Sequence, residues 1–210
     1  MKARLYTIGF AAFPDRTDFL SRLKENGIDA VIDIRSVPRS VILPQFDADT
    51  LPDFLFREGI TYLSFAREFG EQPEDPAAYR DGRLDFEAFA STEAFCSGIA
   101  RLEVGLERGL VPALLSEEAD PASGHGGILV SRALSMLGYE VIHITPAGLK
   151  THAQLETELI SQAREKVLAE RAQLSLLPQE DPAPLSSSAL LELGYRLKNE
   201  QLGSPRVDAY

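Results

Sequence analysis

The sequence predicts an α/β fold of three layers, in which a mainly parallel five-stranded sheet carries helices on both faces and a helical C-terminal extension follows. Short apolar segments alternate with amphipathic segments over residues 1–147, a pattern typical of parallel strands joined by crossover helices. Residues 29–34 form a nearly continuous apolar run, as expected for a strand that is covered on both faces. Beyond residue 147 only helical periodicity continues.

The strands and helices of the first half follow from residue type and turn signals. Strands rich in β-branched and aromatic residues are expected over 5–8, 29–34 and 60–63. The helix between the first two has Asp15 as its predicted N-cap and ends at Asn26-Gly27. A second helix is predicted over 49–58. Residues 70–82 form a polar, Pro-bearing loop that is long enough to cover a site.

The second half continues the alternation. Strands are expected over 111–115 and 139–144, and helices over 86–109 and 128–137. Cys96 lies in the middle of a predicted amphipathic helix, so we interpret it as a small buried hydrophobic residue rather than a nucleophile. This organisation gives an α/β domain at 1–147 and an extension at 148–210.

The extension is predicted to contain a helix over 151–174, a Pro/Ser linker near 178–188 and a short helix over 189–197. Apolar residues recur every three or four positions from Leu155 to Leu168. Such a stripe has to pack on its own domain, on a second copy or on another partner.

Composition restricts the function classes. The net charge of −11 disfavours broad phosphate neutralisation on duplex nucleic acid, although a local basic groove stays open. A single cysteine fits a reducing compartment, and we expect a cytoplasmic location without a membrane segment or secretory signal. The three histidines lack metal-ligand spacing, so we predict neither a metal site nor a cofactor.

The expected ligand site lies beyond the carboxyl ends of the parallel strands. Thr7 and Gly9 end the first strand there, and the densest polar set follows the second strand. That set consists of Asp33, Arg35, Ser36, Arg39 and Ser40. Guanidinium and hydroxyl groups suit a phosphate or carboxylate, which predicts a small anionic ligand. In the alternative interpretation Asp33 and Arg35 pair with each other or with a neighbouring loop.

Two later segments supply groups for proton transfer. Glu118 follows the predicted strand at 111–115, and His125 lies in a glycine-rich turn before the next helix. A carboxylate and an imidazole that reach one substrate suffice for general acid–base catalysis, so Asp33, Glu118 and His125 are the candidate catalytic residues. The alternative is a flexible glycine turn with an exposed histidine. We interpret His143, which alternates with apolar strand residues, as structural.

These segments resemble the domain of unknown function 488 family, a set of small α/β proteins. Residues 5–9 (Leu-Tyr-Thr-Ile-Gly) look like its opening strand. Residues 33–40 (Asp-Ile-Arg-Ser-Val-Pro-Arg-Ser) look like its Asp-x-Arg-Ser-x-Pro-x-Ser signature. Gln-Phe at 45–46 lies where the family has Asn or Gln before Phe. Residues 116–126 and 138–144 resemble its Cys-Ala-Glu, Cys-His-Arg and closing-strand segments. The resemblance covers residues 3–146.

The chain departs from the family pattern at four positions. Phe10 stands where the pattern has His, Ser116 and Gly124 stand where it has Cys, and Gly126 stands where it has Arg. The resemblance therefore leaves enzyme status open. The polar residues at the predicted sheet edge, these departures and the net charge leave three hypotheses open. They are a domain that binds or processes a small anionic or nucleotide-like ligand, a catalytically impaired binding or interaction module, and an accessory protein in single-stranded nucleic-acid processing.

Overall fold

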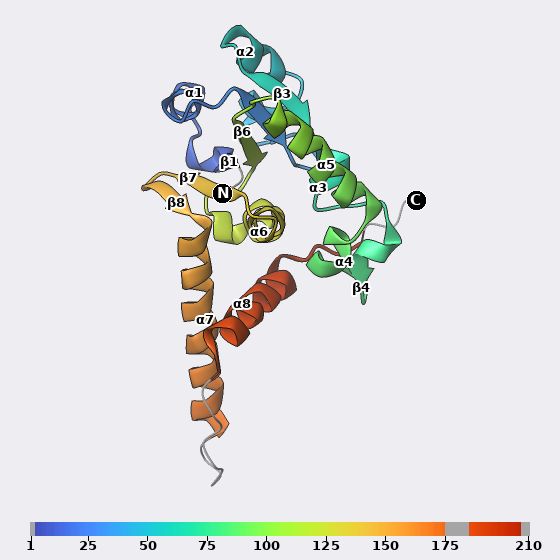
Figure 1. Cartoon of the computed structure of the whole chain (residues 1–210), viewed down its shortest axis with the longest axis vertical. Helices are drawn as coiled ribbons and strands as arrows, with labels where there is room; N and C mark the ends of the chain where they lie inside the picture. The colour runs from blue at the N-terminus through green and yellow to red at the C-terminus, as the bar shows by residue number, and fades with distance from the viewer. Residues whose placement is uncertain (1–2, 175–184, 207–210) are drawn as a thin grey trace.

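A computed structural model describes residues 3–174 and 185–206 and shows an α/β fold with a mostly parallel sheet and C-terminal helices (Figure 1). The strands of this sheet are β1 (Arg4–Gly9), β2 (Ala30–Asp33), β3 (Thr61–Ser64), β6 (Pro112–Ser116), β7 (Glu140–Thr145) and β8 (Gly148–Thr151). Their order across the sheet is β3-β2-β6-β1-β7-β8. All neighbours are parallel except β7 and β8.

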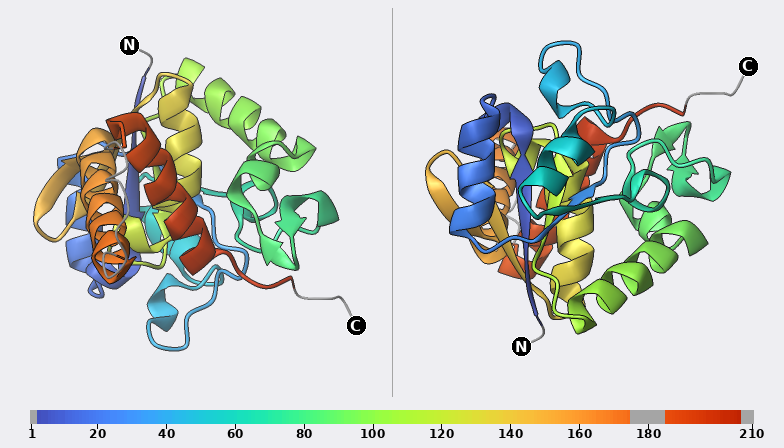
Figure 2. Two further views of the ribbon diagram at one scale, coloured as in Figure 1. Left: turned by 90° about the horizontal axis from the view of Figure 1, so that it is seen from below. Right: turned by 90° about the horizontal axis from the view of Figure 1, so that it is seen from above.

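Helices flank both faces of the sheet. The α-helices are α1 (Arg16–Glu25), α2 (Leu51–Arg57), α3 (Ala66–Phe69), α4 (Phe86–Ala90), α5 (Glu93–Glu107), α6 (Ser131–Met136), α7 (His152–Leu174) and α8 (Ser187–Leu202). Helices α1 and α2 share one buried cluster with one face of the sheet, whereas α5 to α8 share another with the opposite face. Figure 2 brings α8, α7 and α6 to the front in its left view and α1 and α2 in its right view.

The last helix, predicted over 189–197, spans Ser187–Leu202, and most of the predicted Pro/Ser linker near 178–188 lies outside the described residues. Three further differences from the sequence prediction have a local reason. The sixth strand, β8, pairs with β7 through a tight turn that ends at Gly148, whose φ is 117°. A small hairpin of β4 (Tyr79–Arg80) and β5 (Arg83–Leu84) occupies the end of the predicted loop, and its turn residues Asp81 and Gly82 both have positive φ. The helix predicted over 86–109 is divided because the Thr92 side chain caps α5 by accepting from the Phe95 N–H.

The prediction that Cys96 is buried was wrong. Its thiol is exposed on α5, whereas Phe95 and Leu102 of the same helix are buried in the core. The apolar stripe of α5 therefore runs through positions 95 and 102 and leaves position 96 on the solvent side.

The first half of α7 packs on its own chain. Leu155, Leu159 and Ala163 are buried, and Leu155 and Leu159 belong to the same cluster as the sheet and Tyr195 of α8. Farther along, Leu168 is 57% exposed, and α7 projects away from the sheet (Figure 1). Among the described residues, no helix is both long and apolar enough to cross a membrane.

Two of the hollows in the described part of the chain lie at the C-terminal helices and at the carboxyl ends of the central strands. One is a groove between α4, α6 and α8, lined by residues that include Phe86, Leu129 and Leu193. The other lies where β1 and β6 end. From β1 the chain crosses β6 to reach β2, whereas from β6 it crosses β1 to reach β7. The connections therefore leave in opposite directions, and such a switch point is where open α/β sheets bind ligands.

Candidate ligand-binding site at the carboxyl edge of the sheet

The ends of β1 and β6 are in close backbone contact. A Cβ atom at position 9 would lie 1.7 Å from the carbonyl oxygen of Glu118, so only glycine fits at the end of β1. The Ala11 N–H donates to the carbonyl oxygen of Glu117 at 3.0 Å. This contact fixes the segment after β6 against the segment after β1.

Asp33 and Arg35 form a buried ion pair at the end of β2. Arg35 donates to Asp33 through Nε at 2.8 Å and through Nη2 at 2.5 Å, and the two side chains are 5% and 1% exposed. The Tyr62 hydroxyl donates to Asp33 Oδ2 at 2.8 Å. Asp33 and Arg35 thus pair with each other, as the alternative interpretation predicted. With both carboxylate oxygens occupied, Asp33 orients the guanidinium.

The guanidinium of Arg35 lies against an aromatic ring and has one nitrogen without a hydrogen-bond partner. It lies 5.0 Å from the centroid of Phe10, which stacks on Phe46, and its Nη2 also donates to the Phe46 carbonyl oxygen at 2.9 Å. Burial alone would lower the pKa of Arg35, but the hydrogen bond and charge of Asp33 raise it above its ordinary value. The Nη1 atom is buried without a hydrogen-bond partner. Phe10, where the family pattern has His, acts as a ring beneath the cation.

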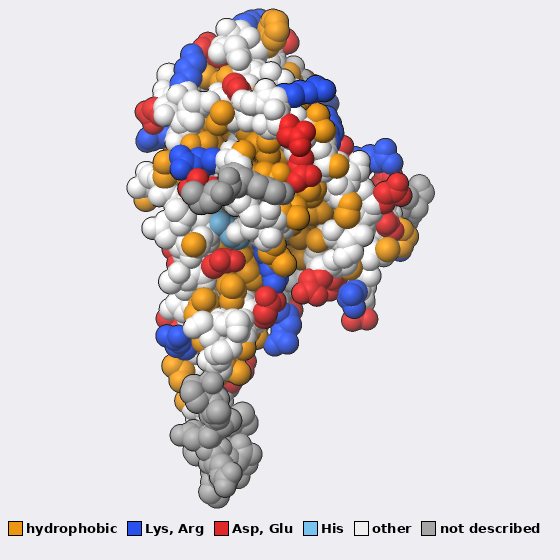
Figure 3. Space-filling model, viewed as in Figure 1, with side chains coloured by type: hydrophobic (Ala, Val, Ile, Leu, Met, Phe, Trp, Pro, Cys, Tyr) orange, Lys and Arg blue, Asp and Glu red, His pale blue; other side chains and the backbone are white. Residues whose placement is uncertain are grey.

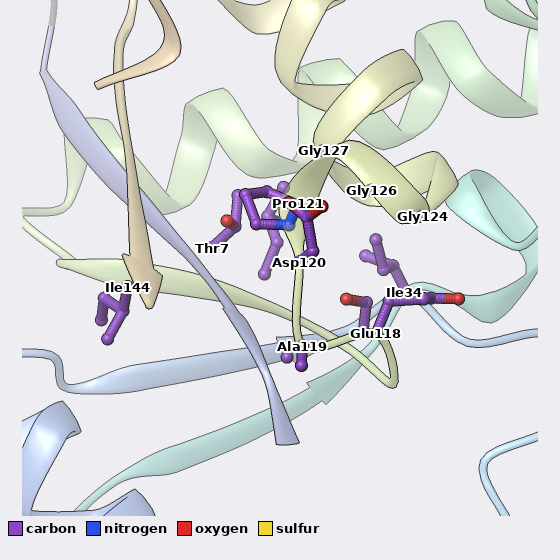
Figure 4. A pocket seen from close by; sticks show the side chains of 13 residues that line it. Thr7, Ile34, Glu118, Ala119, Asp120, Pro121, Gly124, Gly126, Gly127 and Ile144 are labelled. Carbon is purple, nitrogen blue, oxygen red and sulfur yellow. The ribbon is translucent and has the colours of Figure 1, made fainter. Parts of the chain in front are cut away.

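The two glutamates that follow β6 have different neighbours. The negative charge of Glu117 contributes to the raised pKa of Arg35. The Glu118 carboxylate lies against the glycine turn, where a Cβ at position 124 would be 2.4 Å from Oε2. That oxygen is buried and has no partner. Figure 4 shows Glu118 and Ile34 beneath the turn that carries Gly124 and Gly126.

His125 is buried beside a residue that sequence reasoning missed. Its Nδ1 lies 3.7 Å from Glu71 Oε2, and the same oxygen accepts from the Ser36 N–H at 3.4 Å. His125 Nε2 is buried without a partner. Glu71 comes from the loop predicted to cover a site, but its orientation depends on tertiary packing that no local motif indicates. His125 is only 7% exposed, which contradicts the alternative interpretation of a flexible turn with an exposed histidine.

The predicted site residues fall into two groups on opposite faces of the sheet edge. Asp33 and Arg35 lie with Phe10 and Phe46 on the side of α1 and α2. Glu118 and His125 lie around the turn before α6, and no hydrogen bond joins them in the described part of the chain. Ser36, next to Arg35, connects the groups through Glu71.

The cavity at this edge is small. Thr7, Gly9, Glu118 and the glycine turn line it, and its free space has room for about one water molecule (Figure 4). Among the described residues, no group of three His, Cys, Asp or Glu side chains is arranged to hold a metal ion.

The remaining predicted ligand-binding residues have other partners. Ser40 is part of a turn, because its N–H donates to Asp47 and its hydroxyl accepts from the Leu43 N–H. Arg39 is exposed and pairs with Asp49 at 3.0 Å. Arg39 and Ser40 are therefore not part of the candidate site. Thr7 lines the cavity and is hydrogen-bonded to His143 of the neighbouring strand β7.

Comparison with known proteins agrees with the resemblance. A family model described as "Domain of unknown function DUF488" matches residues 15–133. The matched segment contains Arg35, Glu118 and His125, whereas Thr7 and helices α7 and α8 lie outside it. No curated protein and no solved structure matches the chain.

Proposed function

The chain belongs to the DUF488 family, and from the geometry of its site we propose that it binds a small anionic, nucleotide-like ligand at the carboxyl edge of the sheet. One observation carries the proposal. Four buried side-chain nitrogen or oxygen atoms in the described residues lack a hydrogen-bond partner, and three of them are Arg35 Nη1, Glu118 Oε2 and His125 Nε2. An unpaired buried polar atom costs about 1–3 kcal/mol, so each of these three atoms indicates a missing partner at this edge of the sheet.

The chemistry of these atoms favours a ligand with two kinds of polar group. Arg35 Nη1 donates, and it suits a phosphate or carboxylate oxygen. Glu118 accepts, so it suits a hydroxyl or amino group and repels a bare anion. A sugar phosphate or a nucleotide carries both kinds of group. This combination supports the nucleotide-like member of the class over inorganic anions.

Ligand entry requires a local movement. The cavity holds about one water molecule, and the Glu118 carboxylate fills the space beside Gly124. Rotation of this side chain away from the turn would open the space and leave the backbone contact of Gly9 unchanged. If the ligand is also processed, Glu118 and His125 are the groups placed to exchange protons, whereas Gly124 and Gly126 contribute no functional side chain.

No specific observation on the described residues favours nucleic acid as the ligand. The chain carries 21 basic and 32 acidic residues, and the face in Figure 3 has Lys and Arg scattered among Asp and Glu. Around the site, the charge of Arg35 is neutralised by Asp33. A small ligand that contacts a few groups is therefore the proposal.

The test is a thermal-shift panel of inorganic phosphate, ribose 5-phosphate and adenosine monophosphate. Arg35→Lys keeps a positive charge beside Asp33 but removes the unpaired Nη1 donor, and Arg39→Lys is the matched exposed control. Wild type and Arg39→Lys should show the same rise in melting temperature with the two organic phosphates. In Arg35→Lys the affinity should fall about tenfold or more, which corresponds to about 1.4 kcal/mol. Equal shifts in both variants, or none in wild type, would overturn the proposal.

A further inference from the structure

A continuous chain of hydrogen bonds runs from the cavity to the C-terminal helices. Thr7 Oγ1 lies 2.7 Å from His143 Nδ1, and His143 Nε2 lies 3.2 Å from His152 Nδ1. His152 Nε2 lies 2.9 Å from the Tyr195 hydroxyl, which donates to Glu156 Oε1 at 2.9 Å. The chain thus connects β1 and β7 to α7 and α8. We call these five residues the relay.

Both imidazoles of the relay are buried and neutral. Burial, with smaller contributions from His152 and Lys150, lowers the pKa of His143 to about 3. Burial, with a smaller contribution from Arg132, lowers the pKa of His152 to about 4. A neutral imidazole has one donor nitrogen and one acceptor nitrogen. Each histidine of the relay therefore donates one hydrogen bond and accepts the other.

The acceptor at the far end fixes the direction of every bond. A carboxylate only accepts, so the Tyr195 hydroxyl donates its hydrogen bond to Glu156, and the Tyr195 oxygen accepts from His152 Nε2–H. His152 Nδ1 is then an acceptor, and His143 Nε2–H donates a hydrogen bond to it. His143 Nδ1 in turn accepts from the hydroxyl of Thr7. The one hydroxyl proton of Thr7 is consequently directed at His143.

We propose that the relay makes Thr7 an obligatory hydrogen-bond acceptor in the cavity, so that the ligand must place a hydroxyl or amino donor at Thr7 Oγ1. This inference rests on the proposed function and adds a specificity determinant to it. Thr7 lines the cavity with Glu118 (Figure 4), and both side chains then offer acceptors. The relay also makes the C-terminal helices part of the site, although His152, Glu156 and Tyr195 lie outside the family match.

The relay has charged neighbours that hold its outer end. Arg132 lies over the ring of Tyr195, with its guanidinium carbon 4.0 Å from the ring centroid, and donates to both carboxylate oxygens of Glu192. Lys150 pairs with Glu158 rather than with a relay residue. Tyr195 is therefore fixed between Arg132 and Glu156, and Tyr195→Phe would remove the hydrogen bonds while keeping the ring over which Arg132 packs.

Nitrogen-15 NMR of histidine-labelled full-length protein tests the direction of the relay. At pH 7 His143 and His152 should each carry their proton on Nε2. In Tyr195→Phe, His143 should become a mixture of the two neutral tautomers, although it lies two hydrogen bonds from the substitution. A wild-type His143 protonated on Nδ1, or a His143 signal that Tyr195→Phe leaves unchanged, would overturn the inference.

Calorimetric titration with ribose 5-phosphate and inorganic phosphate tests the specificity. Wild type and Thr7→Ser should bind ribose 5-phosphate about tenfold or more tightly than phosphate, equivalent to about 1.4 kcal/mol. Thr7→Val should lose this preference and keep its affinity for phosphate. Binding of both probes by wild type with equal affinity overturns the inference and leaves the proposed function standing. If wild type binds neither probe, the proposed function and the ligand requirement at Thr7 both fail.

Discussion

Close backbone approach at Gly9 is the residue-scale feature that fixes the site. A Cβ there would overlap the Glu118 carbonyl, which is backbone and has no rotamer to change. We expect Gly9→Ala to lower the free energy of unfolding by about 2–4 kcal/mol, as overpacking does, when measured by urea denaturation. Gly105→Ala in α5, where the nearest atom is the flexible Leu110 side chain at 3.2 Å, should change stability by no more than about 1 kcal/mol. Equal stability of Gly9→Ala and wild type would contradict this packing.

The two relay histidines should make stability depend on pH. Their folded pKa values of about 3 and about 4 lie below the ordinary 6.5, so the unfolded chain binds more protons once the pH falls below 6.5. The contribution of these two histidines to the free energy of unfolding should be constant above about pH 7.5. Below pH 6.5 it should fall by up to roughly 1.4 kcal/mol per pH unit for each histidine. His152→Gln should about halve this slope in urea titrations at pH 7.5, 6 and 5, whereas equal wild-type stability at pH 7.5 and 5 would contradict the assignment.

Residue type and position predicted where several polar side chains of the candidate site lie. Asp33, Arg35, Glu118 and His125 follow strand ends in the sequence, and the structure places all four at the carboxyl edge. The sequence could not show that Arg35 is held by Asp33 rather than free, or that Glu71 reaches His125. Both facts depend on side-chain directions that tertiary packing sets.

At the scale of elements, α7 should be anchored by its first half alone. Leu159 is 1% exposed and packs in the core, whereas Leu168 on the same helix is 57% exposed. Leu159→Ala should destabilise the protein by about 2–5 kcal/mol because it leaves a cavity, and Leu168→Ala should stay within about 0.5 kcal/mol. Urea denaturation measures both. A large loss for Leu168→Ala, together with a change of mass in light scattering, would instead indicate a partner on the second half of α7.

Long periodic elements were predictable and short ones were not. The parallel strands and α1, α5 and α7 follow from apolar periodicity. The hairpin of β4 and β5 contains only four strand residues. Strand β8 is a short edge strand that contains a single large apolar residue. Neither segment therefore has a hydrophobic pattern that predicts a strand. The start of α5 after Thr92 depends on one side-chain cap.

At the scale of the whole molecule, strand order creates the site. Because β6 lies between β2 and β1, the segments after three strands that are distant in sequence reach one edge. Apolar patterning predicts the strands but not their neighbours, since every buried parallel strand has a similar composition. The contribution of α7 and α8 through the relay is also a property of the assembled fold, as the histidines alone gave no ligand spacing.

Mapping where ribose 5-phosphate binds tests the central claim most directly. In a titration followed by amide chemical shifts, we predict saturable changes confined to the segments after β1, β2 and β6 and to the glycine turn, residues 7–10, 35–36 and 116–126. Changes that map instead to the groove between α4, α6 and α8, or no saturable change at all, would contradict a ligand site at the carboxyl edge of the sheet.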